Sequence, residues 1–336
     1  MEGAAGPEGG GRGAAVEVRE QVLGTGLLAA RRPLVVMLSG GRDSVCLLDL
    51  VVDLRGAGLV RALHVNYGLR AEASEEDQHH CERLCERLGV ALEVLRPLRG
   101  PGNVQAWARN VRYEAALLLA ERDDALVAVG HTATDQIETV LYRLAASPGR
   151  RALLGMPAAE GRLIRPLLGV TREQTAAYCV ARGLAWREDA TNETDAYARG
   201  RVRHGLLAAL RAVHPGADGN VLRTAQLLRE ETDLLEQLVD RELDGETSIA
   251  IERLGELHPA LARLVVVRLA EGAAGPGAFV PQAGDRVAEI LELAGRQGRA
   301  ELHIGGLLAA VIEQRRLRMV KIAPHYPSPA RDAERD

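Results

Sequence analysis

Residues 34–44 have the sequence LVVMLSGGRDS, in which a short apolar run leads directly into two glycines flanked by hydroxyl and charged side chains. The run Leu34–Leu38 has the length of a buried strand, and a helical pattern begins near Ser44. Two adjacent glycines, Gly40 and Gly41, permit backbone conformations and a close approach that a Cβ would obstruct. Successive N–H groups, with the positive end of a helix dipole behind them, would then surround an anion. The stretch predicts a strand, a phosphate-binding loop and a helix.

The same alternation continues after this loop. Further apolar runs occur at Val60–Val65, Val90–Leu95 and Ala125–Val129, and helix signals lie between them. These signals are a helical segment that stops at Gly89, an N-cap at Asn103, and a capping box formed by Thr171 and Gln174. Strands that alternate with helices indicate βαβ units. We therefore predict an α/β fold with a doubly wound, mostly parallel sheet.

The pattern changes near residue 215. An amphipathic helix over Asn220–Val239 is followed by predicted helices at Pro259–Ala270 and Pro281–Ala294. Three short β-like runs then surround turn signals at Gly305-Gly306 and near Gln314. We predict four parts: a disordered tail over residues 1–15, the α/β domain over 16–214, a smaller helical domain with a small antiparallel sheet over 215–325, and a flexible tail over 326–336.

Composition limits the classes of partner. The chain has 336 residues and a net charge of −4, so it lacks the uniform positive charge that is typical of nucleic-acid proteins. Any such partner would be held by local clusters, of which one comprises Arg315, Arg316, Arg318 and Lys321. No run approaches the roughly 20 apolar residues of a membrane span. We expect a soluble, cytoplasmic protein without membrane contact.

The four cysteines bear on metal and sulfur chemistry. They are Cys46, Cys81, Cys85 and Cys179, and no Cys-x-x-Cys pair occurs among them. Their spacing argues against an iron–sulfur or zinc site and is compatible with a reducing cytosol.

Polar residues follow the second and fourth apolar runs. Ligands of open parallel sheets bind at the carboxyl ends of the strands, where His64 and His131 are expected to lie beside the phosphate loop. His131 would donate to a phosphate. Asp135 and Glu138 stand three apart at a helix start, so their carboxylates share a side and could hold Mg²⁺ or a cationic amine. The alternative for this pair is that it only complements the helix dipole.

Charged residues elsewhere in this region suggest further contacts. Asp43 lies within the anion loop, where a carboxylate is more suited to Mg²⁺ or to a nucleophile than to bare phosphate. Arg109 and Arg112 stand three apart on the helix before the fourth run, where they either brace phosphates or face solvent.

The loop lacks the Gly-Lys-Ser/Thr ending of a Walker A motif and the Gly-x-Gly-x-x-Gly pattern of dinucleotide-binding proteins. It resembles the PP-loop of ATP pyrophosphatases, and the order of motifs resembles that of the tRNA(Ile)-lysidine synthases in their short form. The matching segments are residues 39–44, 64–70, 108–113, 130–139, 155–156, 165–168, 186–192 and 201–203. Thr132, Thr134, Gly200 and Tyr67 stand where that family usually has histidine, an acid, asparagine and histidine.

The resemblance implies an adenine nucleotide α-hydrolase-like fold, with a PP-loop ATP-binding catalytic domain over 16–214 and a tRNA-contacting α+β domain over 215–325. It implies ATP-dependent ligation of free L-lysine to C2 of the wobble cytidine of tRNA(Ile) with a CAU anticodon. An adenylated base is the intermediate, and the products are lysidine, AMP and pyrophosphate. ATP and Mg²⁺ are the implied cofactors.

The resemblance also implies roles for individual residues. Those implied for nucleotide binding are Ser39, Gly40, Gly41, Arg42, Asp43, Ser44 and His64. Those implied for catalysis are Asp43, Arg109, His131 and Asp135, with Asp43 and Asp135 holding the metal. Those implied for substrate binding are Arg112, Glu138, Arg201 and Arg203.

Three other functions fit parts of the pattern. A PP-loop tRNA thiolase of the 2-thiocytidine type shares the fold. Sulfur transfer generally needs paired cysteines or a cluster, however, and the four cysteines of this chain do not have that spacing. A PP-loop synthetase with a small-molecule acceptor would leave the second domain idle. A non-catalytic tRNA- or nucleotide-binding module would explain Thr132, Thr134 and Gly200. A homodimer is compatible with the sequence.

Overall fold

The computed structural model describes residues 8–147, 149–188, 198–295 and 298–322. The chain divides into two compact units, Met1–Leu228 and Arg229–Asp336. Helix α10 (Ala217–Leu243) contains this division, whereas the boundary expected from the sequence, after residue 214, lies just before the helix begins. One continuous helix therefore belongs to both units. The expected tail over 326–336 lies outside the described residues.

The first unit contains a six-stranded sheet with the order β3-β2-β1-β4-β6-β5. All neighbouring strands pair in parallel except β5 with β6, which is antiparallel. The strands are β1 (Leu34–Met37), β2 (Val60–Val65), β3 (Ala91–Leu95), β4 (Leu126–Ala128), β5 (Ala159–Glu160) and β6 (Leu163–Ile164). The mostly parallel, doubly wound sheet predicted from the sequence is confirmed.

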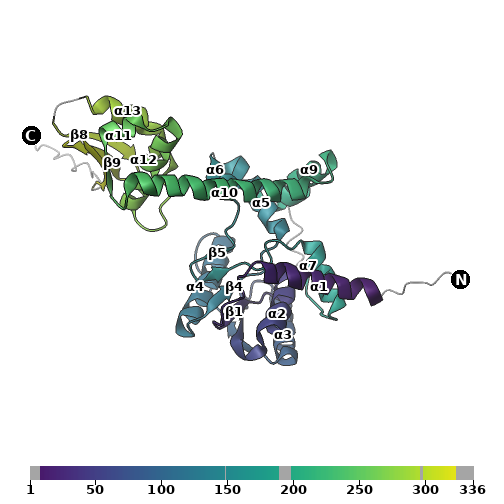
Figure 1. Cartoon of the computed structure of the whole chain (residues 1–336). Coiled ribbons are helices and arrows are strands. Elements are labelled where there is room, and N and C mark those ends of the chain that lie inside the picture. Colours follow the sequence, from purple (N-terminus) through teal and green to yellow (C-terminus); the bar gives the residue numbers. More distant parts are fainter. Residues whose placement is uncertain (1–7, 148, 189–197, 296–297, 323–336) are drawn as a thin grey trace, which may run out of the picture. The chain divides into compact units, whose positions relative to one another are not determined.

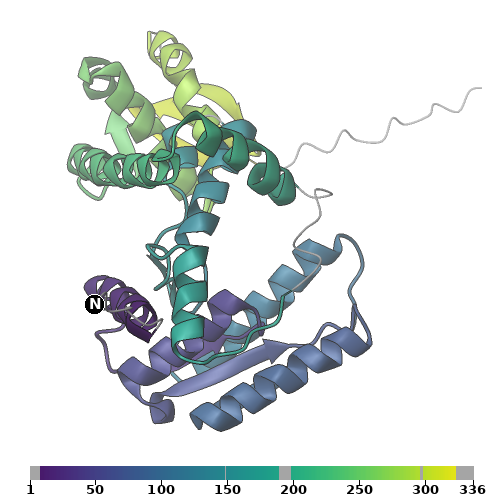
Figure 2. The same ribbon diagram turned by 90° about the vertical axis from the view of Figure 1, so that its right-hand side faces the viewer.

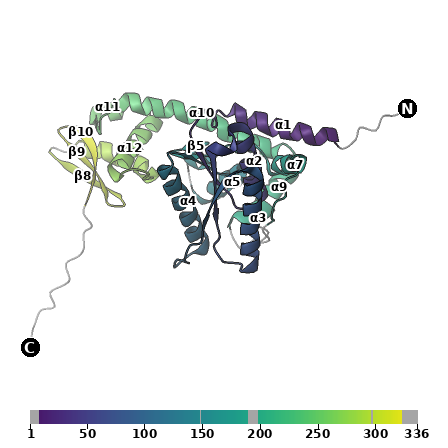
Figure 3. The same cartoon turned by 90° about the horizontal axis from the view of Figure 1, so that it is seen from below.

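Helices cover both faces of this sheet (Figures 1 and 3). Side chains of α1, α2, α3 and α7 form one buried cluster with alternate residues of β1 and β2, and side chains of α4 form a second cluster with the others. The helices of this unit are α1 (Glu8–Gly24), α2 (Arg42–Arg55), η1 (Ala57–Leu59), α3 (Glu72–Leu88), α4 (Val104–Arg122), α5 (Ala133–Ala146), α6 (Arg150–Leu153), α7 (Arg172–Ala181), α8 (Ala198–Arg201), η3 (Val202–Leu207) and α9 (Ala208–Val213). Strand residues that alternate between two apolar clusters explain why the runs in the sequence are continuously hydrophobic.

Helix α1 corrects one expectation. Residues 1–15 are expected to form a disordered tail, but α1 begins at Glu8. The glycines at its start weaken the helix pattern in the sequence. The apolar residues that pack against the rest of the unit come later in the helix. Val18 and Val22, four residues apart, are 1% and 0% exposed, and α1 lies beside α7 in Figures 1 and 3. Tertiary packing thus stabilises a helix that has weak intrinsic propensity.

The second unit has a four-stranded sheet with the order β7-β10-β9-β8, and every neighbouring pair is antiparallel. Its strands are β7 (Ser248–Ala250), β8 (Ala300–Gly305), β9 (Leu308–Glu313) and β10 (Arg316–Lys321). The yellow strands lie together with green helices beside them in Figures 1 and 2. Those helices are α11 (Ile251–Glu256), α12 (Pro259–Ala274), η4 (Pro281–Arg286) and α13 (Val287–Leu293). The predicted helices-plus-sheet architecture is confirmed.

The predicted single helix over Pro281–Ala294 is wrong in its first half. The chain forms the 3₁₀-helix η4 and then the short α-helix α13. Gly284 packs so closely that a Cβ there would lie 3.1 Å from a methyl carbon of Val267 and 3.2 Å from the carbonyl oxygen of Arg263. This close approach to α12 accompanies the change of helix type.

Candidate active site

The first turn of α2 has no side-chain cap. Its N-cap residue is Gly41, which makes no side-chain hydrogen bond, whereas α4, α5 and α7 are capped by Asn103, Thr132 and Thr171. The first N–H groups of a helix have no partner within the helix, so an uncapped start offers them to a ligand. Their position after β1, at the carboxyl edge of the sheet, makes this turn a candidate anion site.

Two serine hydroxyls make hydrogen bonds within this loop. The Oγ atoms of Ser39 and Ser44 lie 3.0 Å apart, and the Ser44 hydroxyl donates to the carbonyl oxygen of Gly41 at 2.8 Å. The Ser39 N–H donates to Ser44 Oγ at 3.2 Å. These bonds stabilise the shape of the loop.

Gly40 has a φ of +83°, a conformation that residues with a Cβ rarely adopt. A Cβ at this position would lie 3.3 Å from the Sγ atom of Cys81 on α3. The segment before residue 189 also holds the loop, since the N–H of Arg187 donates to the Gly40 carbonyl oxygen at 2.9 Å. Residues 189–192, part of the motif resemblance, lie outside the described residues.

His64 lies at the end of β2, against the first residues of the loop. Its Nδ1 is 3.0 Å from the carbonyl oxygen of Leu38, and burial lowers its pKa, although that hydrogen bond opposes the shift. In the neutral ring Nδ1 must carry the proton, because a carbonyl can only accept. The Nε2 atom is buried and has no hydrogen-bond partner among the described residues. It is therefore a hydrogen-bond acceptor to which a donor group of a ligand could bind.

Two carboxylates from different helices meet at one guanidinium. Nη2 of Arg172, the first residue of α7, lies 3.0 Å from Oδ1 of Asp135 on α5. Nε of the same side chain lies 3.6 Å from Oδ2 of Asp43 on α2. The structure thus brings the two predicted metal ligands together, with a cation that the sequence analysis did not single out between them.

The environments of the two carboxylates differ. Burial raises the pKa of Asp43 in spite of the Thr175 hydrogen bond and the charge of Arg172. Burial alone would also raise the pKa of Asp135, but Arg172, the Thr132 donors and His131 together hold it below its usual value. Asp135 is therefore the more firmly ionised member of the pair.

Glu138 is buried one turn further along α5. Both of its oxygens are bound by Arg203, with distances of 2.6 Å from Nε to Oε1 and 3.1 Å from Nη2 to Oε2. Arg203 lies in the π-helix η3, a rare form that often occurs at functional sites. The charges of Asp135 and Asp43 also raise the pKa of Arg203, although its burial acts against them. Glu138 thus holds the guanidinium of Arg203 by two hydrogen bonds.

The other predicted arginines are placed differently. The guanidinium carbons of Arg109 and Arg112, both on α4, lie 4.7 Å and 5.7 Å from the ring centroid of Tyr113. Their described contacts are thus with an aromatic ring rather than with the carboxylates. Arg201 is exposed at the end of α8.

A metal at this site would need ligands from outside the protein. Among the described residues there is no group of three or more His, Cys, Asp or Glu side chains that could hold an ion. Two carboxylates beside a phosphate loop nevertheless suit Mg²⁺, which commonly binds one or two carboxylates and completes its shell with phosphates and water. The residues present fit a nucleotide-bound metal better than a resident one.

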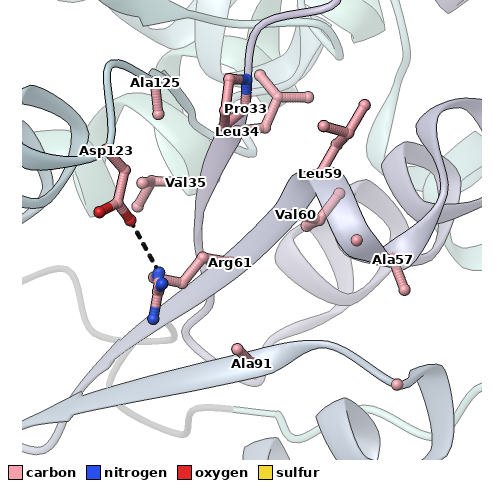
Figure 4. Close-up of a pocket in the computed structure, with 12 residues that line it drawn as sticks. Pro33, Leu34, Val35, Ala57, Leu59, Val60, Arg61, Ala91, Asp123 and Ala125 are labelled. Atoms are coloured by element: carbon pink, nitrogen blue, oxygen red, sulfur yellow. Dashed lines mark hydrogen bonds and ion pairs between the residues drawn. The ribbon is translucent and has the colours of Figure 1, made fainter.

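The cavity shown in Figure 4 lies elsewhere. Its volume is about 390 Å³, and its walls include Pro33, Leu34, Val60 and Ala91 at the amino ends of three strands. Arg61 and Asp123 form an ion pair of 3.0 Å across it. None of the predicted site residues lines this cavity, so it is separate from the candidate active site.

Comparisons with known proteins agree with this geometry. Residues 16–210 match the model of a family described as PP-loop domain. A tRNA(Ile)-lysidine synthase of Salinispora arenicola is 36% identical over 313 residues, which cover 87% of this chain and 92% of the relative. The chain belongs to the tRNA(Ile)-lysidine synthase family. The family resemblance seen in the motifs is thereby confirmed.

Other family members are longer. The synthase of Solibacter usitatus is 36% identical over 84% of this chain but 66% of its own length, and that of Pseudomonas fluorescens is matched over 48% of its length. The chain therefore spans about half to two thirds of these two relatives.

The fold also occurs among solved structures. The U34-tRNA thiolase NcsA of Methanococcus maripaludis, solved with its [4Fe-4S] cluster, aligns with a TM-score of 0.55 and 16% identity. The alignment covers 65% of this chain and 80% of the thiolase.

No helix among the described residues of this family member is long and apolar enough to cross a membrane.

Arg172 and Thr175 are two residues of the site that were not predicted from the sequence. Both lie on α7, which contributes no motif to the phosphate loop, yet the Thr175 hydroxyl donates to Asp43 Oδ1 at 2.5 Å. The available signal was the capping box at Thr171, which places Arg172 in the first turn of a helix. A cation is unfavourable there unless an acidic partner lies nearby.

Proposed function

We propose that this member of the tRNA(Ile)-lysidine synthase family uses ATP to join free L-lysine to C2 of the wobble cytidine of tRNA(Ile) with a CAU anticodon. Family membership and the uncapped start of α2 beside Asp43 and Asp135 carry the proposal. The protein acts in the cytoplasm as a monomer or homodimer.

The chemistry explains why a phosphate cradle is needed. The C2 oxygen of cytosine is a poor leaving group until it has attacked the α-phosphorus of ATP and displaced pyrophosphate. The ε-amine of lysine then attacks C2, and AMP leaves with that oxygen. The N–H groups at the start of α2, with Ser39, Ser44 and His131, would stabilise the negative charge that develops on the phosphates. The target base would have to leave the anticodon stack to reach them.

The remaining residues would orient the substrates. Asp43 and Asp135 would hold Mg²⁺, which neutralises phosphate charge when it is bound. The buried Nε2 acceptor of His64 would meet a donor group of the nucleoside. Arg203, fixed by Glu138, would contact the substrate near the carboxylates.

Part of the positive charge of the arginine-rich hairpin in the second unit is paired with glutamates. Arg315 pairs with Glu252, and Arg318 pairs with Glu313 at 3.4 Å. These exposed pairs are weak, so tRNA phosphates could replace the glutamates at small cost. We propose that this surface, with Arg112 and Arg201, contacts tRNA through phosphates in a salt-dependent manner.

The cysteines disfavour the thiolase alternative. All four are free and buried. Burial raises the pKa of Cys81, and it raises that of Cys85 to about 12. Thiols in such surroundings are poor nucleophiles because the thiolate is the reactive form.

Pyrophosphate release tests the proposal directly. The protein is mixed with ATP, Mg²⁺ and a tRNA(Ile) transcript bearing a CAU anticodon, with and without lysine, and digested tRNA is examined by mass spectrometry. We expect release that depends on the CAU transcript, and a cytidine product that carries lysine. Release without lysine incorporation under any condition would indicate another acceptor, and no release with any tRNA would leave only a binding function.

A further inference from the structure

Arg172 occupies the space between the two acidic residues of the site. Its side chain is 23% exposed, and those of Asp43 and Asp135 are 19% and 11% exposed, so all three are largely withdrawn from water. They come from the first turns of α7, α2 and α5. Three separate helices are thus joined through one guanidinium.

The outer carboxylate oxygens are satisfied by other donors. Asp43 Oδ1 accepts from the Thr175 hydroxyl at 2.5 Å and lies 3.4 Å from Nε of Arg42. Asp135 Oδ2 accepts from both the N–H and the hydroxyl of Thr132, each at 2.9 Å. The inner oxygens, Asp43 Oδ2 and Asp135 Oδ1, face Arg172.

The position of Arg172 has no local explanation on its own helix. A positive side chain in the first turn opposes the helix dipole. The cap of α7 is supplied by Thr171 and Gln174, which satisfy each other's backbone N–H groups without Arg172. The carboxylates are therefore the reason for the conformation that Arg172 adopts.

We propose that Arg172 is a built-in counter-cation that occupies the place of the divalent metal between Asp43 and Asp135, and that it moves to the nucleotide phosphates when the metal and nucleotide bind. This inference rests on the proposed function for the identity of the metal and nucleotide. A guanidinium and a metal ion cannot both lie between the same two oxygens. The displaced guanidinium is always charged, and its planar fork matches phosphate oxygens.

The exchange couples the two binding events. Without nucleotide, a metal must displace Arg172 and leave it without an anionic partner. With nucleotide present, the phosphates at the start of α2 offer Arg172 a new partner, and metal binding becomes easier. Arg172 is accordingly a positioning residue that delays metal binding until the nucleotide is present.

Metal titration without nucleotide tests the idea. Mn²⁺, followed by electron paramagnetic resonance, replaces Mg²⁺, and wild type is compared with Arg172→Gln. Loss of the competing cation should tighten Mn²⁺ binding roughly 10-fold, within the range of 5- to 150-fold that is typical of coupled sites. The stimulation of Mn²⁺ binding by a non-hydrolysable ATP analogue should shrink by the same factor. Mn²⁺ binding to Arg172→Gln that is equal to or weaker than wild type overturns the proposal.

Two matched variants control for charge and for helix stability. Arg172→Lys keeps a cation and should stay close to wild type in Mn²⁺ affinity. Arg182→Gln removes the arginine at the C-cap of α7, which lies 2.9 Å from the buried carboxylate of Asp49, and should leave Mn²⁺ affinity unchanged. Equal tightening in Arg182→Gln would show a general charge effect and refute the specific exchange.

A second measurement does not depend on the folding of Arg172→Gln. The Nε atom of Arg172 is buried, so its N–H signal should be visible by NMR and is assigned by its loss in Arg172→Lys. Addition of Mg²⁺ with the ATP analogue should shift or abolish this signal. An unchanged signal at saturating metal and analogue contradicts the proposal. Because neither assay requires tRNA or lysine, failure of the overall reaction would be distinguished from failure of this exchange.

Discussion

Replacement of Arg203 with methionine should destabilise the first unit strongly. Glu138 is 1% exposed at its side chain and is held by two bonds of 2.6 and 3.1 Å from Arg203, which is itself 21% exposed. Removal of one partner from such a buried pair costs about 3–5 kcal/mol, because the other charge is left without compensation. For a unit of this size, that loss corresponds to a fall in Tm of roughly 6–20 °C.

The double variant Glu138→Gln/Arg203→Met tests whether the uncompensated charge of Glu138 causes this loss of stability. Because the double variant has no buried charge without a partner, its loss of unfolding free energy should be at least about 1 kcal/mol smaller than the summed losses of the two single variants, as expected of residues in direct contact. Urea unfolding and calorimetry measure both quantities. Arg211→Gln is the matched control, since Arg211 and Asp218 form an exposed pair, with 43% and 31% exposed side chains, that should be worth ~1 kcal/mol or less. Strict additivity, or a cost for Arg203→Met no larger than that of the control, would refute the reasoning.

Three further variants probe the loop and its surroundings. Gly130→Ala should weaken binding of an ATP analogue by roughly 10-fold or more in calorimetric titration, because its Cβ would lie 3.1 Å from the backbone oxygen of Asp43 and displace the start of α2. Gly155→Ala should lower stability by about 1–3 kcal/mol, since φ there is +66° and the Cβ would lie 2.6 Å from Oε1 of Gln136; unchanged urea unfolding would contradict this. His64→Gln should reduce the acid sensitivity of folding. Burial lowers the pKa of His64, so between the folded and unfolded pKa values the unfolded chain binds more protons, and stability falls as pH drops through the histidine range by no more than ~1.4 kcal/mol per pH unit. An equal loss of stability between pH 7.5 and 5.5 in both proteins would exclude this contribution.

Local chemistry made much of the fold predictable. Asn103 was expected to cap a helix, and its side chain accepts from the N–H groups of Gln105 and Ala106. The capping box of Thr171 and Gln174 forms as predicted. Such signals depend on residues within one turn of each other, so the sequence alone carries them. The parallel sheet followed from the same logic, since each strand is a short apolar run between two helix signals.

Features that depend on long-range packing were not predictable in this way. Helix α1 exists because Val18 and Val22 are buried in the cluster that also contains residues of α7, far along the chain. Arg172 lies 37 residues from Asp135, and no spacing rule connects them. The π-helix that carries Arg203 likewise has no recognisable local signature; it packs on α5 through buried Val202 and Leu207 and through the ion pair of Arg203 with Glu138. The carboxylates, the phosphate donors and Arg203 were therefore part of the predicted site, whereas Arg172, the cation beside Asp43 and Asp135, was not.

The two threonines that depart from the usual family pattern are connected to the same cluster. Thr132 stands in place of a histidine, and it caps α5 while its N–H and hydroxyl both hold Asp135 Oδ2 at 2.9 Å. Thr134 stands in place of an acid, and its hydroxyl accepts from the backbone N–H of Arg172 at 3.4 Å. A second acid at that position would add negative charge beside a pair that already shares one guanidinium. Neutral hydroxyls at both positions add no negative charge, so Asp43 and Asp135 face Arg172, with Arg42 also 3.4 Å from Asp43. The two threonines are therefore compatible with the proposed metal and nucleotide binding at this carboxylate pair.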